Sequence, residues 1–311
     1  MNLKEKMKKN KPFLGLILFA IIISIINPRF SSTINILNIF RQTSINAIIA
    51  VGMTLVILTG GIDLSVGSIL ALTGAICSLM IKNNVNILVV LVIVILLGGL
   101  LGCINGLIIS KLNLQPFIIT LVSMTVLRGL TLVITDGKPI TIGNIKGIFE
   151  FLGNGYFFKI PFPVILMIII FILMNYVLKY TRFGRYIYAI GGNEETAKLS
   201  GIDTAKFKTL AYVLSGIFAT ISGFIVTSRL ASAQPTAGSG YELDAIAAVV
   251  LGGTSLSGGI GTISGTLVGA LIIGILSNAL NLLNVTAYYQ MIIKGLVIFI
   301  AVVIDIKSNK N

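Results

Sequence analysis

Repeated apolar runs, most of them about as long as a lipid bilayer is thick, constrain this chain more than any other feature. Hydrophobic residues make up 56% of its 311 residues and charged residues 11%, whereas a soluble domain carries about 25% charged residues. A helix of about 20 apolar residues crosses the ~30 Å of hydrocarbon in a membrane. The sequence therefore predicts an all-α, polytopic membrane protein with one transmembrane domain over residues 1–311.

We count about ten apolar segments that could each form a transmembrane helix. One of them is short for a full crossing and could be tilted or re-entrant, because irregular backbone is tolerated at membrane depth only where protein or a cavity covers it. This short segment spans residues 242–253. The others cover residues 12–27, 45–60, 64–82, 86–110, 116–135, 161–179, 209–230, 260–284 and 288–304.

The basic residues predict the orientation of these spans. With the N-terminus in the cytoplasm and ten crossings, the inside segments (1–11, 111–115, 179–208 and 305–311) hold 14 Lys and Arg, and the outside segments hold 7. Such an excess on the cytoplasmic side is typical of membrane proteins. We therefore expect a multi-pass protein of the bacterial inner membrane with both termini cytoplasmic and an uncleaved first span. The net charge of +13 indicates topology and not nucleic-acid binding, because the charges lie at span ends.

The residues available for chemistry are few. The chain has no histidine and only two cysteines, Cys77 and Cys103, both inside apolar runs. Histidine-based catalysis is therefore excluded, and we expect buried thiols with no disulfide or metal site. The phosphate-loop pattern G-x-x-x-x-G-K-[ST] is absent as well. We expect no catalytic residues and no cofactor in this chain, so that any ATP is bound by a partner.

One polar segment, residues 179–208, interrupts the hydrocarbon-like sequence. After Gly191 and Gly192, Asn193 is a good helix N-cap, and two glutamates follow in the first turn, where the helix dipole favours negative charge. Lys198 lies four residues after Glu194, so an ion pair could form between them. Gly201 stands where a helix C-cap is expected. The segment is either a rigid helical knob or an ordinary solvated loop.

Three separated motifs carry a resemblance to a known family. They are the run Gly191–Ile202, the run Thr59–Ser68 (TGGIDLSVGS) and the run Gly240–Gly259 (GYELDAIAAVVLGGTSLSGG), and the closing stretch Tyr288–Val297 agrees with them. Together they are similar to the permease subunits of bacterial ATP-binding-cassette sugar importers, in the ribose/xylose/galactoside branch. The similarity covers residues 30–306, although the loop 136–160 is poorly determined by it.

The resemblance implies partners and a role for the polar segment. It implies a pore made with a second copy of the chain, a cytoplasmic ATPase subunit, and an extracytoplasmic sugar-binding protein that delivers ribose or a similar monosaccharide. The permease itself would catalyse no bond chemistry. The residues expected to couple it to the ATPase are Gly192, Asn193, Glu194, Glu195, Ala197, Leu199, Ser200 and Gly201.

Several polar residues are candidates for the translocation path or its gate. Asp63 could instead cap a helix that begins at Leu64. Arg128 and Lys294 could instead reach towards the membrane surface or pair with a buried carboxylate. Because tight binding in a pore would slow release, we expect no deep, high-affinity sugar pocket. The candidates are Asp63, Ser65, Ser68, Asn105, Arg128, Gln290 and Lys294.

Two further questions stay open at this stage. Glu242 and Asp244 could face outwards and dock the sugar-binding protein, or play a local role at the start of the short segment 242–253. Two glycine stripes, at 98, 102 and 106 and at 261, 265 and 269, predict close helix contacts, either inside one bundle or across a dimer. The alternative function is an ion-coupled sugar transporter, which usually needs ionisable residues at mid-membrane.

Overall fold

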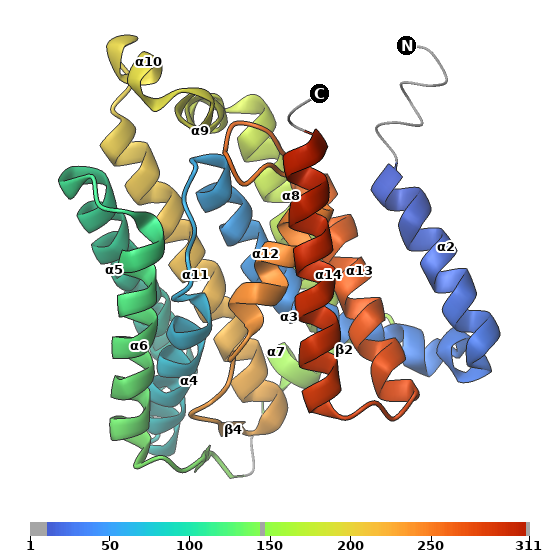
Figure 1. Ribbon diagram of the computed structural model, residues 1–311. Coiled ribbons are helices and arrows are strands. Elements are labelled where there is room, and N and C mark those ends of the chain that lie inside the picture. The colour runs from blue at the N-terminus through green and yellow to red at the C-terminus, as the bar shows by residue number, and fades with distance from the viewer. Residues whose placement is uncertain (1–10, 144–146, 309–311) are drawn as a thin grey trace.

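The computed structural model describes residues 11–143 and 147–308 and shows a bundle of upright helices (Figure 1). The predicted basic clusters at residues 4–9 and at Lys310 lie outside the described residues. Helices α9 (Arg182–Gly192) and α10 (Glu194–Leu199) lie at one end of the bundle, here called the α9–α10 end. The N-terminal end of α2 and the C-terminal end of α14 point to this same end.

Each of the ten predicted apolar segments coincides with a helix. These helices are α2 (Lys11–Ile26), α3 (Thr33–Leu58), α4 (Val66–Lys82), α5 (Ile87–Leu112), α6 (Pro116–Thr135), α8 (Phe162–Tyr180), α11 (Thr204–Leu230), α12 (Tyr241–Leu251), α13 (Ile263–Leu282) and α14 (Ala287–Ser308). Six of them, α3, α5, α6, α8, α11 and α13, are both long and apolar enough to cross a membrane, and shorter apolar stretches lie in α2, α4 and α14.

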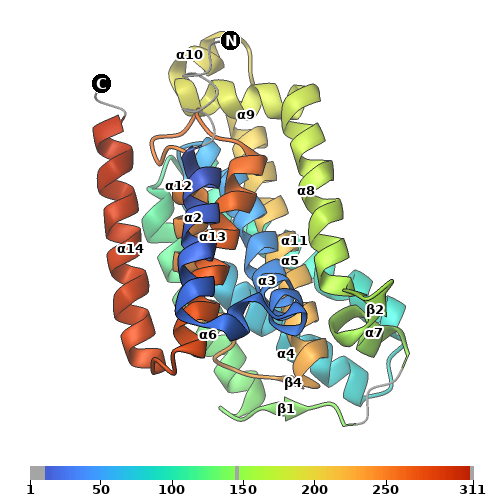
Figure 2. The ribbon, with the colours of Figure 1, turned by 90° about the vertical axis from the view of Figure 1, so that its right-hand side faces the viewer.

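The remaining elements are short. A 3-10 helix η1 (Pro28–Ser31) joins α2 to α3. The segment between α6 and α8 folds into β1 (Ile140–Thr141), α7 (Ile148–Asn154), β2 (Tyr156–Phe157) and β3 (Ile160–Pro161). Strand β1 pairs antiparallel with β4 (Ser232–Ala233). These pieces lie at the end opposite α9 and α10 (Figure 2), where they join segments far apart in the chain.

The second predicted span is wrong at its start. Helix α3 begins at Thr33, twelve residues before the predicted position 45, with the Ser32 hydroxyl accepting the Asn35 N–H as an N-cap. Residues 33–44 contain Asn, Arg and Gln, so a hydropathy argument starts the span too late. The polar groups are accommodated by contacts within the bundle: Asn35 and Asn278 exchange side-chain hydrogen bonds of 3.0 and 2.9 Å.

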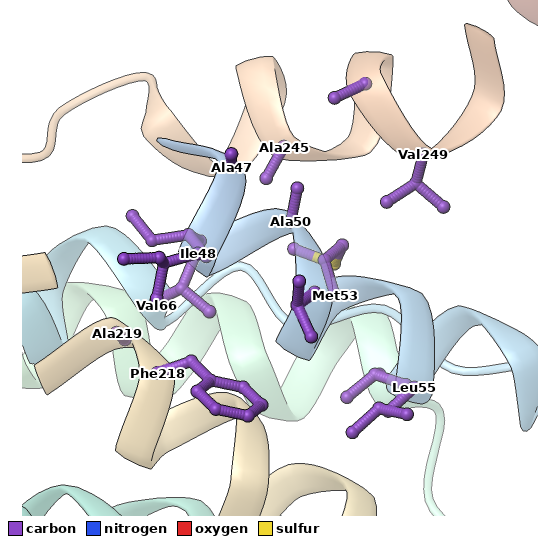
Figure 3. Packing of buried hydrophobic residues seen from close by; sticks show 14 of the residues in the cluster. Ala47, Ile48, Ala50, Met53, Leu55, Val66, Phe218, Ala219, Ala245 and Val249 are labelled. Carbon is purple, nitrogen blue, oxygen red and sulfur yellow. The ribbon is translucent and has the colours of Figure 1, made fainter. Parts of the chain in front are cut away.

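Helix α3 is the central helix of the core. All of its residues from Ala47 to Leu58 are buried. Figure 3 shows α3 between α11, which contributes Phe218 and Ala219, and α12, which contributes Ala245 and Val249. A helix apolar on all sides belongs in the interior of a membrane bundle, surrounded by other helices.

The first glycine stripe packs inside the bundle. Gly98, Gly102 and Gly106 of α5 face α11, and a Cβ atom at Gly102 would overlap the carbonyl group of Tyr212. In lipid, helices associate through such close backbone approach, because hydrophobicity alone gives no drive. The second stripe joins α13 to α12, where Gly269 lies against Ala248. Both stripes are thus contacts within the bundle.

Two helices are too short to cross the bundle alone, and their N-termini meet inside it. Helix α4 begins at Val66 and α12 at Tyr241, and the backbone of Gly238, just before α12, lies against Gly67. Non-helical chain completes each passage: residues 59–65 precede α4, and residues 252–262 follow α12. The segment 242–253 is therefore an 11-residue helix, α12, followed by a loop that reaches the α9–α10 end.

Candidate functional site

The α9–α10 segment has the caps that its sequence predicts. The Asn193 side chain accepts the Thr196 N–H at 2.8 Å. At the other end, Gly201 has φ +82°, and the N–H groups of Gly201 and Ile202 bond back to Lys198 and Ala197. These bonds use backbone groups that a helix end otherwise leaves free. The segment is therefore a knob of defined shape and not a solvated loop.

The predicted pair of Glu194 with Lys198 is wrong. Glu194 Oε2 instead accepts from Lys208 Nζ at 2.8 Å. Lys208 stands in the first turns of α11, so this contact fixes the short helix α10 to a long helix of the bundle. Spacing along one helix cannot reveal a partner that tertiary folding brings in from another element. The contact still leaves α10 protruding, with Leu199 84% exposed.

Behind the knob, four glycines meet, and we call Gly60, Gly191, Gly258 and Gly259 the glycine junction. A Cβ at Gly191 would overlap Leu58 O, and one at Gly258 would come within 2.9 Å of Gly60 N and 3.0 Å of Gly191 O. Gly259 N–H also donates to Leu58 O at 3.0 Å. Only residues without side chains fit here, so α9, the end of α3 and the loop after α12 are in direct backbone contact.

Tyr188 reinforces the junction. Its hydroxyl donates to Gly261 O at 2.8 Å, which ties α9 to the loop between α12 and α13. Burial raises the pKa of the Tyr188 phenol, so the hydroxyl keeps the proton it donates. A displacement of α9 therefore acts on that loop through both a side chain and the backbone.

Asp63 lies in a buried polar network between α3 and α4. Its Oδ1 accepts the N–H of Ser65 at 3.0 Å and the Ser65 hydroxyl at 2.5 Å, and its Oδ2 accepts the Ser215 hydroxyl at 2.7 Å. The predicted cap is therefore wrong in position: α4 begins at Val66 with Ser65 as its N-cap residue, and Asp63 stabilises the turn before the helix. Asp63 and Ser65 are both 0% exposed.

The same network extends to two more helices. Asn105 Nδ2 donates to Ser65 Oγ at 3.0 Å, and Ser123 of α6 hydrogen-bonds to Asn105 Oδ1. Ser68 donates to Met124 O at 2.8 Å. These hydrogen bonds tie α4 to α5 and α6. The side chains of Asp63, Ser65, Ser68 and Asn105 thus have protein partners and face no open surface in this state.

Arg128 and Glu242 have a different setting, because they line an open groove. Arg128 donates to Pro235 O at 2.6 Å and to Ala237 O at 2.9 Å, and so holds the chain that leads into α12. Glu242 Oε1 accepts the Gly240 N–H at 3.2 Å. Between them, a groove is lined by Met124, Thr125, Gly129, Leu132 and Ser239. Arg128 is therefore satisfied inside the protein and does not reach towards a membrane surface.

Lys294 pairs with a carboxylate, as one of the two readings of the sequence predicts. Its Nζ lies 2.7 Å from Asp244 Oδ2, and both side chains are mostly buried. Of the two alternatives for Asp244, the local role fits this pairing, and Glu242 likewise has a local contact with the N–H of Gly240. Gln290 donates to Asn281 Oδ1 and to Val285 O, both at 2.8 Å, and so closes the turn between α13 and α14. In the described ranges, no three His, Cys, Asp or Glu gather where they could hold a metal ion.

The two loops that border the glycine junction share a short sequence pattern. The loop before α4 reads Gly60-Gly-Ile-Asp-Leu-Ser65, and the loop after α12 reads Gly252-Gly-Thr-Ser-Leu-Ser257. The first loop runs from the end of α3, at the α9–α10 end, to the start of α4, and the second loop runs from the end of α12 to the α9–α10 end. The repeated pattern Gly-Gly-x-x-Leu-Ser could have predicted that the two loops have related positions.

Comparison with known proteins agrees with this architecture. Residues 35–302 match a family described as the permease component of branched-chain amino acid transport systems. The chain is 57% identical over 299 residues to the ribose import permease protein of Haemophilus influenzae, covering 96% of this chain and 93% of that protein. It is 56% identical over 304 residues to the ribose import permease protein of Bacillus subtilis, covering 97% and 94%. The chain belongs to this permease family.

Relatives with lower identity are named for other sugars. The D-allose transport system permease protein of Escherichia coli is 40% identical over 294 residues, covering 94% of this chain and 90% of that protein. No solved structure matches the chain. The resemblance to permease subunits of ATP-binding-cassette sugar importers is thereby confirmed, and a multi-pass membrane protein follows from the family and the apolar helices together.

Proposed function

We propose that this chain is the membrane permease subunit of an ATP-driven importer for ribose. The observation that carries the proposal is the 52–57% identity to ribose import permeases over nearly the whole chain, against 39–40% to permeases named for allose and arabinose. The chain supplies the passage, and a separate subunit binds and hydrolyses the ATP. The whole chain crosses the membrane ten times with both termini in the cytoplasm.

The α9–α10 end is the side of the ATPase in this proposal. The charge distribution of the sequence supports it, because residues 179–208 are rich in lysine and arginine. Basic residues gather in the cytoplasmic segments of membrane proteins. The protruding helix α10 offers Glu195 and Leu199 as exposed contacts. A push on α10 reaches the glycine junction through α9, and the junction leads to α4 on one side and to α12 on the other.

A second copy of the chain completes the pore. The groove with Arg128 and Glu242 lies on α6, a helix whose other exposed residues are mostly apolar. Ionic side chains facing lipid are costly, so covering this groove with another protomer stabilises it. The sugar-binding protein would then dock at the opposite end, where α7 and the short strands lie.

The ion-coupled alternative has less support. A cation-coupled carrier keeps an ionisable residue available at mid-membrane. Here Asp244 is paired with Lys294, and Asp63 accepts three hydrogen bonds from two serines. Neither carboxylate is available to a coupling cation in this arrangement.

Uptake into proteoliposomes tests the proposal. The permease is reconstituted with its ATPase, and radiolabelled D-ribose uptake is measured with the sugar-binding protein outside and ATP inside. We expect uptake only when the ATPase, ATP and binding protein are all present. Uptake by the permease alone under a proton or sodium gradient would overturn the proposal in favour of a secondary transporter.

A further inference from the structure

A second polar cavity lies away from the groove on α6, between α3, α12, α13 and α14. Its volume is about 230 Å³. Its polar lining includes Thr43, Asn46, Asp244, Ser277, Asn281 and Lys294, and its apolar lining includes Ala248, Ala270 and Ile273. At roughly 30 Å³ per water molecule, the cavity exceeds what one or two structural waters fill.

Two buried acceptors in this cavity have no partner in the described part of the chain. The atoms Thr43 Oγ1 and Asn46 Oδ1 are both buried, and neither makes a hydrogen bond there. Leaving a buried polar atom unpaired is unfavourable, so such atoms normally have a protein, solvent or ligand partner. Their presence together in one cavity indicates that the cavity receives a molecule that can donate hydrogen bonds.

The charges in the cavity indicate that this molecule is neutral. Asp244 and Lys294 already neutralise one another at 2.7 Å. An anion or a cation would bring a charge that the neutral pair does not offset, and that buried charge would lack compensation. A neutral polyol instead donates hydroxyls to Asn46, Thr43 and Asp244 and accepts from Lys294, while its C–H faces contact the ring of Tyr241 and the apolar wall.

One wall of the cavity is a peripheral helix. Helix α14, which contributes Gln290 and Lys294, stands at the edge of the bundle and packs mainly on α12 (Figure 2). Helix α12 connects through residues 252–262 to the glycine junction. The position of this wall is therefore mechanically linked to the α9–α10 end.

We infer that this cavity is a weak binding subsite for a monosaccharide inside the permease, opened and closed as α12 and α14 move. The inference rests on the proposed function, because it takes the transported sugar as the ligand. A small cavity with few polar contacts fits low affinity, which allows the sugar to leave again.

Two substitutions remove the unpartnered atoms without changing the ion pair. Thr43→Val keeps the side-chain shape, and Asn46→Leu keeps the branching of the side chain while it removes the polar atoms. Ser78→Ala is the matched control, since Ser78 Oγ is also buried without a partner in the described residues but lies in α4, outside the cavity. If the atoms have no ligand, all three changes are neutral or stabilising.

The test measures binding and transport separately in the permease–ATPase complex. In nanodiscs without binding protein, saturation-transfer NMR is recorded with millimolar D-ribose. We expect a signal for the wild type and for Ser78→Ala, and one about tenfold weaker for the double variant Thr43→Val/Asn46→Leu. In proteoliposomes, the double variant should lower the maximal uptake rate several-fold and leave the half-saturating ribose concentration, set by the binding protein, unchanged.

The outcomes separate this inference from the proposed function. Two outcomes would overturn the subsite alone and assign the cavity to water. In the first, the wild type takes up ribose but gives no NMR signal. In the second, the double variant binds and takes up ribose as well as the wild type does. If the wild type takes up no ribose, the proposed function fails, and the subsite is judged by the same NMR titration with D-allose and L-arabinose. Absence of binding for all three sugars then rejects it. If the double variant unfolds at or above the wild-type temperature, a loss of ribose binding or uptake in this variant is not caused by misfolding.

Discussion

Gly191 of α9 lies directly against Gly259 of the loop after α12, with the Gly259 Cα 3.0 Å from the position of a Cβ on Gly191. This contact joins the surface knob to the interior of the bundle without any intervening side chain. Packed backbone transmits displacement with little loss, because interiors are dense and their compressibility is low. The contact connects the α9–α10 segment directly to the loop that follows helix α12.

Substituting Gly191 should separate α9 from the loop. In Gly191→Ala, the new methyl group overlaps Leu58 O and must push α9 outward. We expect ATP-driven uptake to fall at least about tenfold, while the protein still inserts in the membrane. Gly15→Ala, in α2 and outside the coupling segment, is the comparison, because a Cβ there meets nothing within 4 Å. Equal losses in the two variants would argue against the glycine junction.

The knob itself should be needed for coupling and not for stability. Glu195 and Leu199 are exposed on α10, so replacing both with alanine removes little packing within this chain. We expect the thermal unfolding temperature to stay within about 2 °C, and sugar-stimulated ATP hydrolysis to fall about tenfold or more. Lys198→Ala, an exposed change in the same helix, serves as control. Undiminished assembly and stimulation in the double variant would exclude this segment as the ATPase contact.

Asp63 should be replaceable by a residue that keeps its hydrogen bonds. In Asp63→Asn, one side-chain oxygen still accepts from Ser65, and the amide can bond to Ser215 Oγ. Asp63→Leu instead leaves the Ser65 and Ser215 groups unpaired, at a cost of about 1–3 kcal/mol for each buried group. We expect Asp63→Asn to transport sugar and Asp63→Leu to unfold at a clearly lower temperature in detergent. Inactive but stable Asp63→Asn would mean that the charge itself takes part in transport.

The ion pair of Lys294 with Asp244 should show coupling in a double-mutant cycle. Lys294→Met leaves the Asp244 carboxylate mostly buried without its partner, and we expect a loss of about 1–3 kcal/mol in unfolding free energy. Lys294→Met combined with Asp244→Asn removes the uncompensated charge and should recover much of that loss. Additive effects of the two changes would show that the pair contributes no interaction energy.

The glycine stripe on α5 should tolerate no side chain. Gly102→Ala places a Cβ against the Tyr212 carbonyl and forces α5 away from α11, at about 1–3 kcal/mol. Gly129→Ala, in α6, meets nothing within 4 Å and is the control. The readout is the midpoint of thermal aggregation of the detergent-solubilised protein. A Gly102→Ala midpoint equal to that of the control would contradict the close packing of α5 on α11.

Local signals in the sequence predict the helices and their ends well. The caps at Asn193 and Gly201 are correct, because capping depends only on a few neighbouring residues. The apolar segments mark the helices because lipid requires a continuous hydrophobic surface. The start of α3 escaped this signal, since its first polar turns are satisfied by Asn278 from α13, which lies far away in the chain.

The sequence by itself thus determined a helical membrane protein and the caps at Asn193 and Gly201, because hydropathy and capping act over short distances along the chain, and its separated motifs indicated the family. The tertiary structure alone decided which polar groups meet. It paired Glu194 with Lys208, Asp63 with Ser215, and Lys294 with Asp244, and it brought four glycines from three segments into one junction. Those partners depend on how helices pack side by side, and no spacing within a single helix encodes them.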